Sequence, residues 1–277
     1  MDLVTLINLP TQERERAMPY REARIYSGAM LEIERKHCTH HGRIIGAGRK
    51  RMGVTGKAQA EINRKNAQRK LVRLLCVNFA KGDLHITLTD DTGVGLDALK
   101  KASAKFLRKL RTFAAGQGKA LKYIAVLEWK AVRPHWHIVC QRLAVTPEQL
   151  GQMWGLGRVG MDELDGSPDY GWFARYLSKQ AEREKGEKRW SQSKNLEKPV
   201  EPEPKVLKRK ALASRPQVPK GYYVLASYRY ATSYGYEGEY IVAIREDRRK
   251  ELPPALLDAM EESGTWMEFA MLADSGA

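Results

Sequence analysis

Cysteine is scarce in this chain of 277 residues, which contains only Cys38, Cys76 and Cys140. Their number is odd and their spacing fits no disulfide framework, so we expect reduced thiols in a cytoplasm. Long apolar runs are also missing, and we therefore expect neither a signal peptide nor a membrane span. No Gly-rich phosphate loop of the Walker type occurs, which argues against a fused helicase.

Acidic residues are outnumbered, because 48 Lys and Arg face 33 Asp and Glu, for a formal net charge of +15. The charge is also segregated along the chain. Residues 43–73 contain ten basic residues and one acid, whereas residues 251–277 contain six acids and no Lys or Arg. This distribution is typical of a phosphate-binding surface and favours a nucleic-acid substrate, although a merely soluble basic protein has a similar composition.

Breaks in the sequence pattern predict four segments. Residues 1–75 are Arg-rich and form a basic N-terminal extension, with a helix over 57–75 and no need of a core of its own. Residues 76–196 have the periodicity of a folded domain. Residues 197–220 are a Pro- and Lys-rich linker, and residues 221–277 contain a small β-hairpin and an acidic helical tail.

Residues 76–196 are predicted to form an α+β domain. Apolar periodicity predicts strands at 84–89, 121–128, 135–141 and 157–161, and helices at 97–113, from Thr146, and around Tyr170. Thr146 and Gln149 form a capping box at the start of the second of these helices. The resulting β-α-β-β-α-β-α order implies a ferredoxin-like (RRM-like) antiparallel sheet with helices packed on one face.

The segment after Glu128 contains the most informative pattern. His135 and His137 lie two residues apart on a predicted strand, so both imidazoles project from the same face. Glu128 can reach the same point across a short turn closed by Pro134. Two nitrogens and one oxygen suit a divalent transition ion or magnesium and leave positions open for water or phosphate. The alternative is a polar strand face with two surface histidines.

The helix around Tyr170 is predicted to begin at Ser167 or Asp169, with Pro168 in its first turn. Its expected core stripe consists of Tyr170, Phe173, Ala174, Leu177 and Ala181. Tyr176 and Lys179 are neighbours on the helix and project away from this stripe. By itself, such a Tyr-x-x-Lys pair in a chain with 12 tyrosines carries little information.

A second group of potential ligands consists of His37, Cys38, His40 and His41. It is either a metal site or a basic loop. No second ligand pair at zinc-finger spacing lies near it, which favours the loop.

Three motifs taken in order are far more specific than any one of them. They are a strand ending in Thr87-Leu88-Thr89, the histidine pair with its glutamate, and the Tyr-x-x-Lys helix. In this the chain resembles the HUH endonuclease superfamily, and within it the rolling-circle replication initiators of bacterial plasmids and single-stranded DNA phages. The resemblance spans about residues 84–196. Trp136 stands between the histidines, where a smaller aliphatic residue is often found, and its side chain should face the core. Trp172 stands where two-tyrosine initiators carry a second tyrosine, which indicates a single-tyrosine enzyme.

The resemblance implies an HUH endonuclease fold and metal-dependent, sequence-specific nicking of single-stranded DNA at a replication origin. Tyr176 would be the nucleophile, Lys179 would favour its phenolate, and Glu128, His135 and His137 would hold Mg²⁺ or Mn²⁺. The products would be a 5′-phosphotyrosine and a free 3′-hydroxyl, and the reverse reaction would rejoin the strand at termination.

The implied partners are origin DNA, a host helicase and a DNA polymerase in the cytoplasm of a bacterial host, with no membrane. Within the superfamily, a relaxase or a single-strand transposase is the alternative, although no third histidine follows His137 as in relaxases. Outside it, the alternatives are a non-catalytic DNA-binding regulator with a structural ion and a metal-dependent hydrolase that uses water.

Overall fold

The computed structural model of the chain describes residues 19–38, 56–129, 133–177, 189–207, 212–231 and 237–252. The chain divides into two compact units. Unit 1 combines residues 1–55 with 199–277, and unit 2 is residues 56–198. Each unit contains a five-stranded sheet. No helix within the described ranges is long and apolar enough to cross a membrane.

Unit 2 is built on an antiparallel sheet with the strand order β6-β3-β5-β4-β7. Its strands are β3 (Leu84–Thr89), β4 (Tyr123–Glu128), β5 (His135–Cys140), β6 (Val159–Glu163) and β7 (Ser191–Gln192). The predicted strands and hairpin are therefore confirmed, and so is the ferredoxin-like α+β class. Because β5 lies between β3 and β4, His135 is paired with Thr89 on one side and Glu128 on the other.

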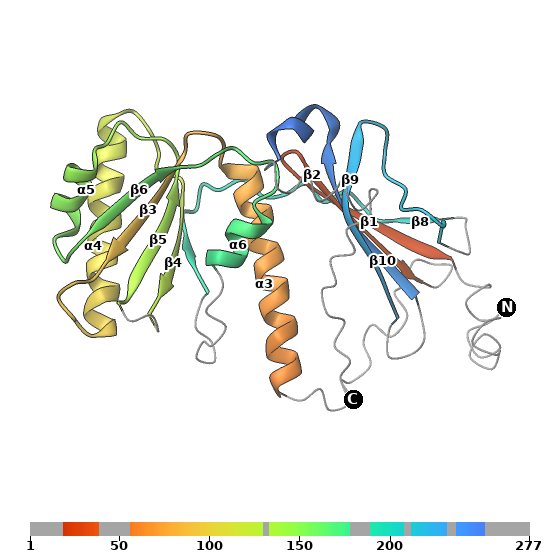
Figure 1. Ribbon diagram of the computed structural model, residues 1–277, viewed down its shortest axis with the longest axis horizontal. Helices are drawn as coiled ribbons and strands as arrows, with labels where there is room; N and C mark the ends of the chain where they lie inside the picture. The colour runs from red at the N-terminus through yellow and green to blue at the C-terminus, as the bar shows by residue number, and fades with distance from the viewer. Residues whose placement is uncertain are drawn as a thin grey trace. The chain divides into compact units, whose positions relative to one another are not determined.

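One face of this sheet is covered by α4 (Leu96–Gly116) and α5 (Pro147–Trp154), as Figure 1 shows. The shared core includes Leu84, Ile86, Leu88, Leu99, Phe106, Leu110, Ile138, Leu150 and Trp154. Trp136 packs against this core, as predicted. The predicted capping box is also present, since the Thr146 hydroxyl accepts from the Gln149 N–H and the Gln149 side chain accepts from the Thr146 N–H.

The other face of the sheet is covered by α3 (Gly56–Asn78) and α6 (Gly171–Leu177). The core on this side includes Leu71, Leu74, Leu75, Phe79, Ile124, Val126, Val139, Tyr170, Ala174 and Leu177. The expectation of helices on one face therefore holds only for α4 and α5. The reason is that the alternate residues of β4 and β5 on the second face, such as Val126 and Val139, are apolar and also need burial.

The position of α3 changes the expected division of the chain. The helix was predicted over 57–75 as part of a basic extension, whereas it belongs to unit 2, whose first residue is Gly56. Leu71 and Leu75 on its last turns are almost fully buried against the sheet. Burial of this apolar stripe, rather than the basic composition of the segment, decides where the helix packs.

Unit 1 joins the two ends of the described chain in one sheet, with the strand order β8-β1-β2-β10-β9. The strands are β1 (Tyr20–Ser27), β2 (Met30–His37), β8 (Lys205–Leu207), β9 (Tyr222–Ala231) and β10 (Glu237–Arg245), and a 3₁₀ helix follows at Glu246–Glu251. β9 and β10 form the expected C-terminal hairpin. The acidic tail lies beyond residue 252, outside the described residues.

Two expectations differ from what unit 1 contains. Residues 20–37 are paired strands with a core that includes Leu31 and Ile33, not an extension without a core. The expected linker 197–220 contains β8, which pairs with β1, and Val200, which bridges to Tyr26.

A row of charged side chains crosses unit 1. Arg35 on β2 donates to Glu22 on β1 at 2.7 Å and to Glu239 on β10 at 2.6 Å, and all three are buried. The register places them directly opposite one another. Each buried charge is thus compensated by a partner on a neighbouring strand. This arrangement cannot be predicted from the sequence unless it is known which strands are neighbours.

Candidate metal and nucleophile site

The predicted metal ligands meet at one end of the β4–β5 pair. The Glu128 Oε2 atom lies 3.2 Å from His135 Nε2 and 3.6 Å from His137 Nε2. One ligand atom from each of the three residues lies within 4.8 Å of the others, and no other such group of His, Cys, Asp or Glu occurs in the described ranges. Glu128 and His135 are half-buried and His137 is buried. The cluster could hold a metal ion, and its nitrogen and carboxylate donors fit a divalent cation.

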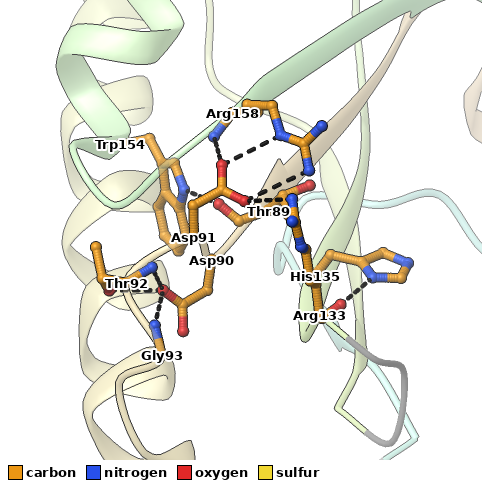
Figure 2. A network of polar contacts seen from close by, with 9 residues as sticks. All are labelled: Thr89, Asp90, Asp91, Thr92, Gly93, Arg133, His135, Trp154 and Arg158. Atoms are coloured by element: carbon orange, nitrogen blue, oxygen red, sulfur yellow. Dashed lines mark hydrogen bonds and ion pairs between the residues drawn. The ribbon is translucent and has the colours of Figure 1, made fainter.

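A backbone carbonyl sets the orientation of His135. Its Nδ1 lies 2.9 Å from the Arg133 carbonyl oxygen. Figure 2 draws this contact as a dashed line. Because a carbonyl only accepts, Nδ1 carries the proton in this hydrogen bond. In the neutral imidazole the lone pair is then on Nε2, the atom that faces Glu128.

His137 is oriented by another histidine, His85 on β3. The His85 Nε2 and His137 Nδ1 atoms are 3.1 Å apart. Burial lowers the pKa of His85, and the charge of Asp162 opposes this shift. A neutral His85 that accepts at Nε2 requires the proton on His137 Nδ1, which leaves His137 Nε2 free of a proton to face Glu128.

His85 was predicted only as part of a strand, without a functional role. One signal could have identified it: the two-residue period places His85 on the same face as Thr87 and Thr89, and β3 pairs with the histidine strand. Without knowledge of that pairing, the side chain has no visible partner. The ring of Phe173 from α6 also contacts His85 edge-on, with 5.0 Å between centroids.

Tyr176 lies on α6 beside the ligand cluster. Its ring centroid is 5.2 Å from that of His137, in an edge-to-face arrangement. Three neighbours in the same segment, Tyr170, Ala174 and Leu177, are buried in the core and anchor the helix. The structure therefore brings together four of the five predicted site residues, while Lys179 lies outside the described residues.

A network of charged groups adjoins the histidine strand, and the sequence did not predict it (Figure 2). The Asp91 carboxylate accepts from Arg133 Nη1 at 3.0 Å and from Arg158 Nε at 3.2 Å. The hydrogen bond and charge of Arg158, with a further contribution from Arg133, lower the pKa of Asp91. The surrounding hollow of about 550 Å³ is lined by Asp90, Asp91, Gly93, Arg133, Pro134 and Arg158. Asp90 and Asp91 balance the formal charges of the two arginines, and the guanidinium groups of Arg133 and Arg158 are the exposed part of the network.

Close backbone packing fixes this network. Gly157 has a φ of +148°, and a Cβ atom there would lie 2.6 Å from the Thr89 carbonyl oxygen. The same carbonyl accepts from the Trp154 indole N–H at 2.8 Å. The chain can therefore bring Arg158 next to Asp91 only with glycine at position 157.

The second group of potential ligands is not assembled within the described residues. His37 is buried and its ring lies 4.1 Å from that of Tyr20. The Cys38 Sγ atom lies 3.5 Å from the Pro19 carbonyl oxygen, and burial raises the pKa of its thiol. His40 and His41 lie outside the described residues. Cys38 therefore packs as a small buried side chain.

Comparison with known protein families gives a match over part of the chain. Residues 83–181 match the family of replication-associated proteins that is described under the name ORF2. This segment includes β3, the ligand cluster and Tyr176. The match supports a replication-initiator family and, with it, a role in replication. No curated protein and no solved structure matches the chain significantly.

Proposed function

We propose that this protein initiates rolling-circle DNA replication by cutting one DNA strand with Tyr176 and rejoining it when the round is complete. The observation that carries the proposal is the contact of the Tyr176 ring with His137, a member of the cluster that could hold a metal ion. The match of residues 83–181 to a replication-associated family supports it independently.

In the proposed reaction the Tyr176 oxygen attacks the scissile phosphorus. The new bond joins this oxygen to phosphorus, the bond from phosphorus to the 3′ oxygen breaks, and the phenol loses its proton while the leaving 3′ oxygen gains one. Lys179 would stabilise the phenolate, since a phenol with an ordinary pKa of about 10 is a weak nucleophile at neutral pH. Because the tyrosyl phosphodiester preserves the energy of the broken bond, a 3′-hydroxyl can reverse the step without ATP.

The ligand cluster would assist this step from a fixed position. Magnesium or manganese held by Glu128, His135 and His137 would polarise a non-bridging oxygen of the scissile phosphate. The hydrogen bonds of His135 to the Arg133 carbonyl and of His137 to His85 hold both rings in place before DNA binds.

The substrate in this proposal is single-stranded at the cut. In-line attack by a side chain fixed on a short helix needs a backbone that can be turned toward it, which paired duplex does not allow. Arg133 and Arg158 would contact phosphates next to the scissile one. Their side chains are 59% and 68% exposed although both bond to Asp91, so each guanidinium can still donate to a phosphate oxygen.

The test is a denaturing gel of the protein mixed with labelled single-stranded origin DNA, with and without manganese. We expect a covalent protein–DNA band that requires metal, disappears with Tyr176→Phe and persists with Tyr170→Phe. Tyr170 is a matched control because it lies just before the same helix and is buried in the core, so that its variant removes a hydroxyl from the same region.

Other outcomes would replace the proposal. Nicked DNA without a covalent band would indicate water as the nucleophile and hence a hydrolase. Binding without cleavage across candidate origins would indicate a DNA-binding regulator with a structural ion. Transfer between strands at a conjugative origin or a transposon end would favour a relaxase or a single-strand transposase.

A further inference from the structure

Trp172 is the most exposed large apolar side chain among the described residues, with 75% of its surface accessible. It lies on α6 one turn before Tyr176. The two rings are nearly parallel, with 5.9 Å between centroids and 9° between planes, so they are stacked with an offset. A tryptophan so exposed gains little from folding, which makes its position beside Tyr176 informative.

Packing of α6 does not account for Trp172. The helix is anchored by Ala174 and Leu177, which are buried, and by Phe173, which packs against the same core. The indole lies outside this contact, and one of its faces is directed at the Tyr176 ring. The aromatic rings thus form a series from His137 through Tyr176 to Trp172.

We propose that Trp172 stacks on a base of single-stranded DNA adjacent to the scissile phosphate. This inference rests on the function proposed above. A nucleobase is the occupant that fits, because it offers a flat ring to the open indole while its phosphate is carried toward Tyr176. The net charge of +15 and the exposed Arg133 and Arg158 favour an anionic partner over an apolar one.

Stacking on Trp172 positions the DNA without selecting a base by its edges. Every base has a π face, and loss of one stacking contact costs about 1–3 kcal/mol by substitution. A base held on the indole limits rotation of the attached backbone, which fixes the phosphate relative to the Tyr176 oxygen. Trp172 is accordingly a positioning residue that acts on the substrate through the base.

The experiment scans an abasic site through the origin oligonucleotide and measures affinity in the Tyr176→Phe background, where no cleavage occurs. With Trp172 present, we expect one position next to the cut at which the abasic site weakens binding about 5- to 150-fold, equivalent to about 1–3 kcal/mol. In Trp172→Ala the abasic site at this position should make no difference, and Trp172→Phe should restore part of the effect. Ile62→Ala, which shortens another exposed apolar side chain of unit 2, should behave as the parent.

The results test base stacking on Trp172 separately from the proposed covalent chemistry of Tyr176. If Trp172→Ala and the parent respond equally to every abasic site, the stacking inference is overturned, whatever the gel assay shows. If the response disappears in Trp172→Ala but the protein with Tyr176 forms no covalent band, stacking stands and the proposed chemistry fails. A change in oligomeric state with unchanged DNA affinity would assign the indole to a protein interface and also overturn the inference.

Discussion

At the scale of single residues, the candidate metal site is determined by two hydrogen bonds behind it. His135 is held by the Arg133 carbonyl and His137 by His85, so each imidazole presents Nε2 to Glu128. Partners of this kind fix the tautomer and ring orientation of metal-bound histidines. The two partners differ, because the carbonyl belongs to the backbone whereas His85 can be replaced.

Replacement of His85 should therefore weaken metal binding. His85→Leu removes the acceptor for His137 Nδ1 and should lower manganese affinity about 10- to 100-fold. His85→Gln places an amide oxygen near the position of the ring Nε2 and should retain most of the affinity. Isothermal titration with manganese in the absence of DNA measures both.

A purely structural role of His85 would give a different result. In that case His85→Leu and His85→Gln would lower the melting temperature of the metal-free protein but bind manganese as the parent does. Equal manganese affinity of His85→Leu and the parent would remove His85 from the site.

At the scale of elements, the ends of three strands combine into one surface. Asp91 follows the end of β3, Arg133 precedes β5, and Arg158 precedes β6. Backbone hydrogen bonds from Thr89 to Arg158 and from Asp90 to Pro134 hold these ends together. The surface therefore depends on the sheet order, with β3 between β5 and β6.

Loss of one arginine from this surface should reduce the salt dependence of DNA binding. Arg158→Gln should weaken binding to single-stranded DNA of any sequence and lower the slope of log affinity against log salt by about 0.7. Arg142→Gln is the matched control, because Arg142 is also exposed and ion-paired with one carboxylate, Glu163, at the opposite end of β6. Fluorescence anisotropy at several salt concentrations provides the slopes. Equal slopes for Arg158→Gln and Arg142→Gln would contradict a phosphate contact at Arg158.

The same elements show what could be predicted from sequence. Alternation and periodicity were enough for β3, β5 and α4, and the spacing of His135 and His137 was enough for their common face. The Arg158–Asp91 and His85–His137 contacts could not be predicted, because they join residues 67 and 52 positions apart whose proximity depends on strand order. Local pattern indicates which face a side chain occupies, but not which strand lies beside it.

At the scale of the whole molecule, the chain contains a second folded unit that its composition did not indicate. The sequence suggested a basic extension and a linker, whereas β1, β2, β8, β9 and β10 form one sheet. Its buried row of Glu22, Arg35 and Glu239 joins segments 204 positions apart. Pairing between strands so far apart in the sequence leaves no local pattern. The predicted segment boundaries therefore differ from the two units of the structure.

The buried row makes the stability of unit 1 depend on pH. Burial raises the pKa of Glu22, but hydrogen bonds and charges of Arg35 and Arg24 outweigh this and leave it below its ordinary value of 4.5. A lowered pKa contributes stability that is present above the ordinary value and is lost as the pH falls through the folded value. Glu22→Gln should therefore destabilise the protein by about 2 kcal/mol near neutral pH.

The difference between Glu22→Gln and the parent should shrink as the pH falls below about 4.5. Thermal unfolding between about pH 3 and pH 7 measures it, and Glu246→Gln, which alters an exposed carboxylate, is the control. A difference that stays constant over this range would mean that the charge of Glu22 does not stabilise the fold.

The central claim, that Tyr176 becomes covalently attached to DNA, is tested most directly by mass spectrometry of the reaction product. After nuclease and trypsin digestion, the peptide that contains Tyr176 and ends at Lys179 should carry a nucleotide through its phosphate, and only when metal was present. Cut DNA with this peptide unmodified, or a nucleotide on any other tyrosine, would contradict the account.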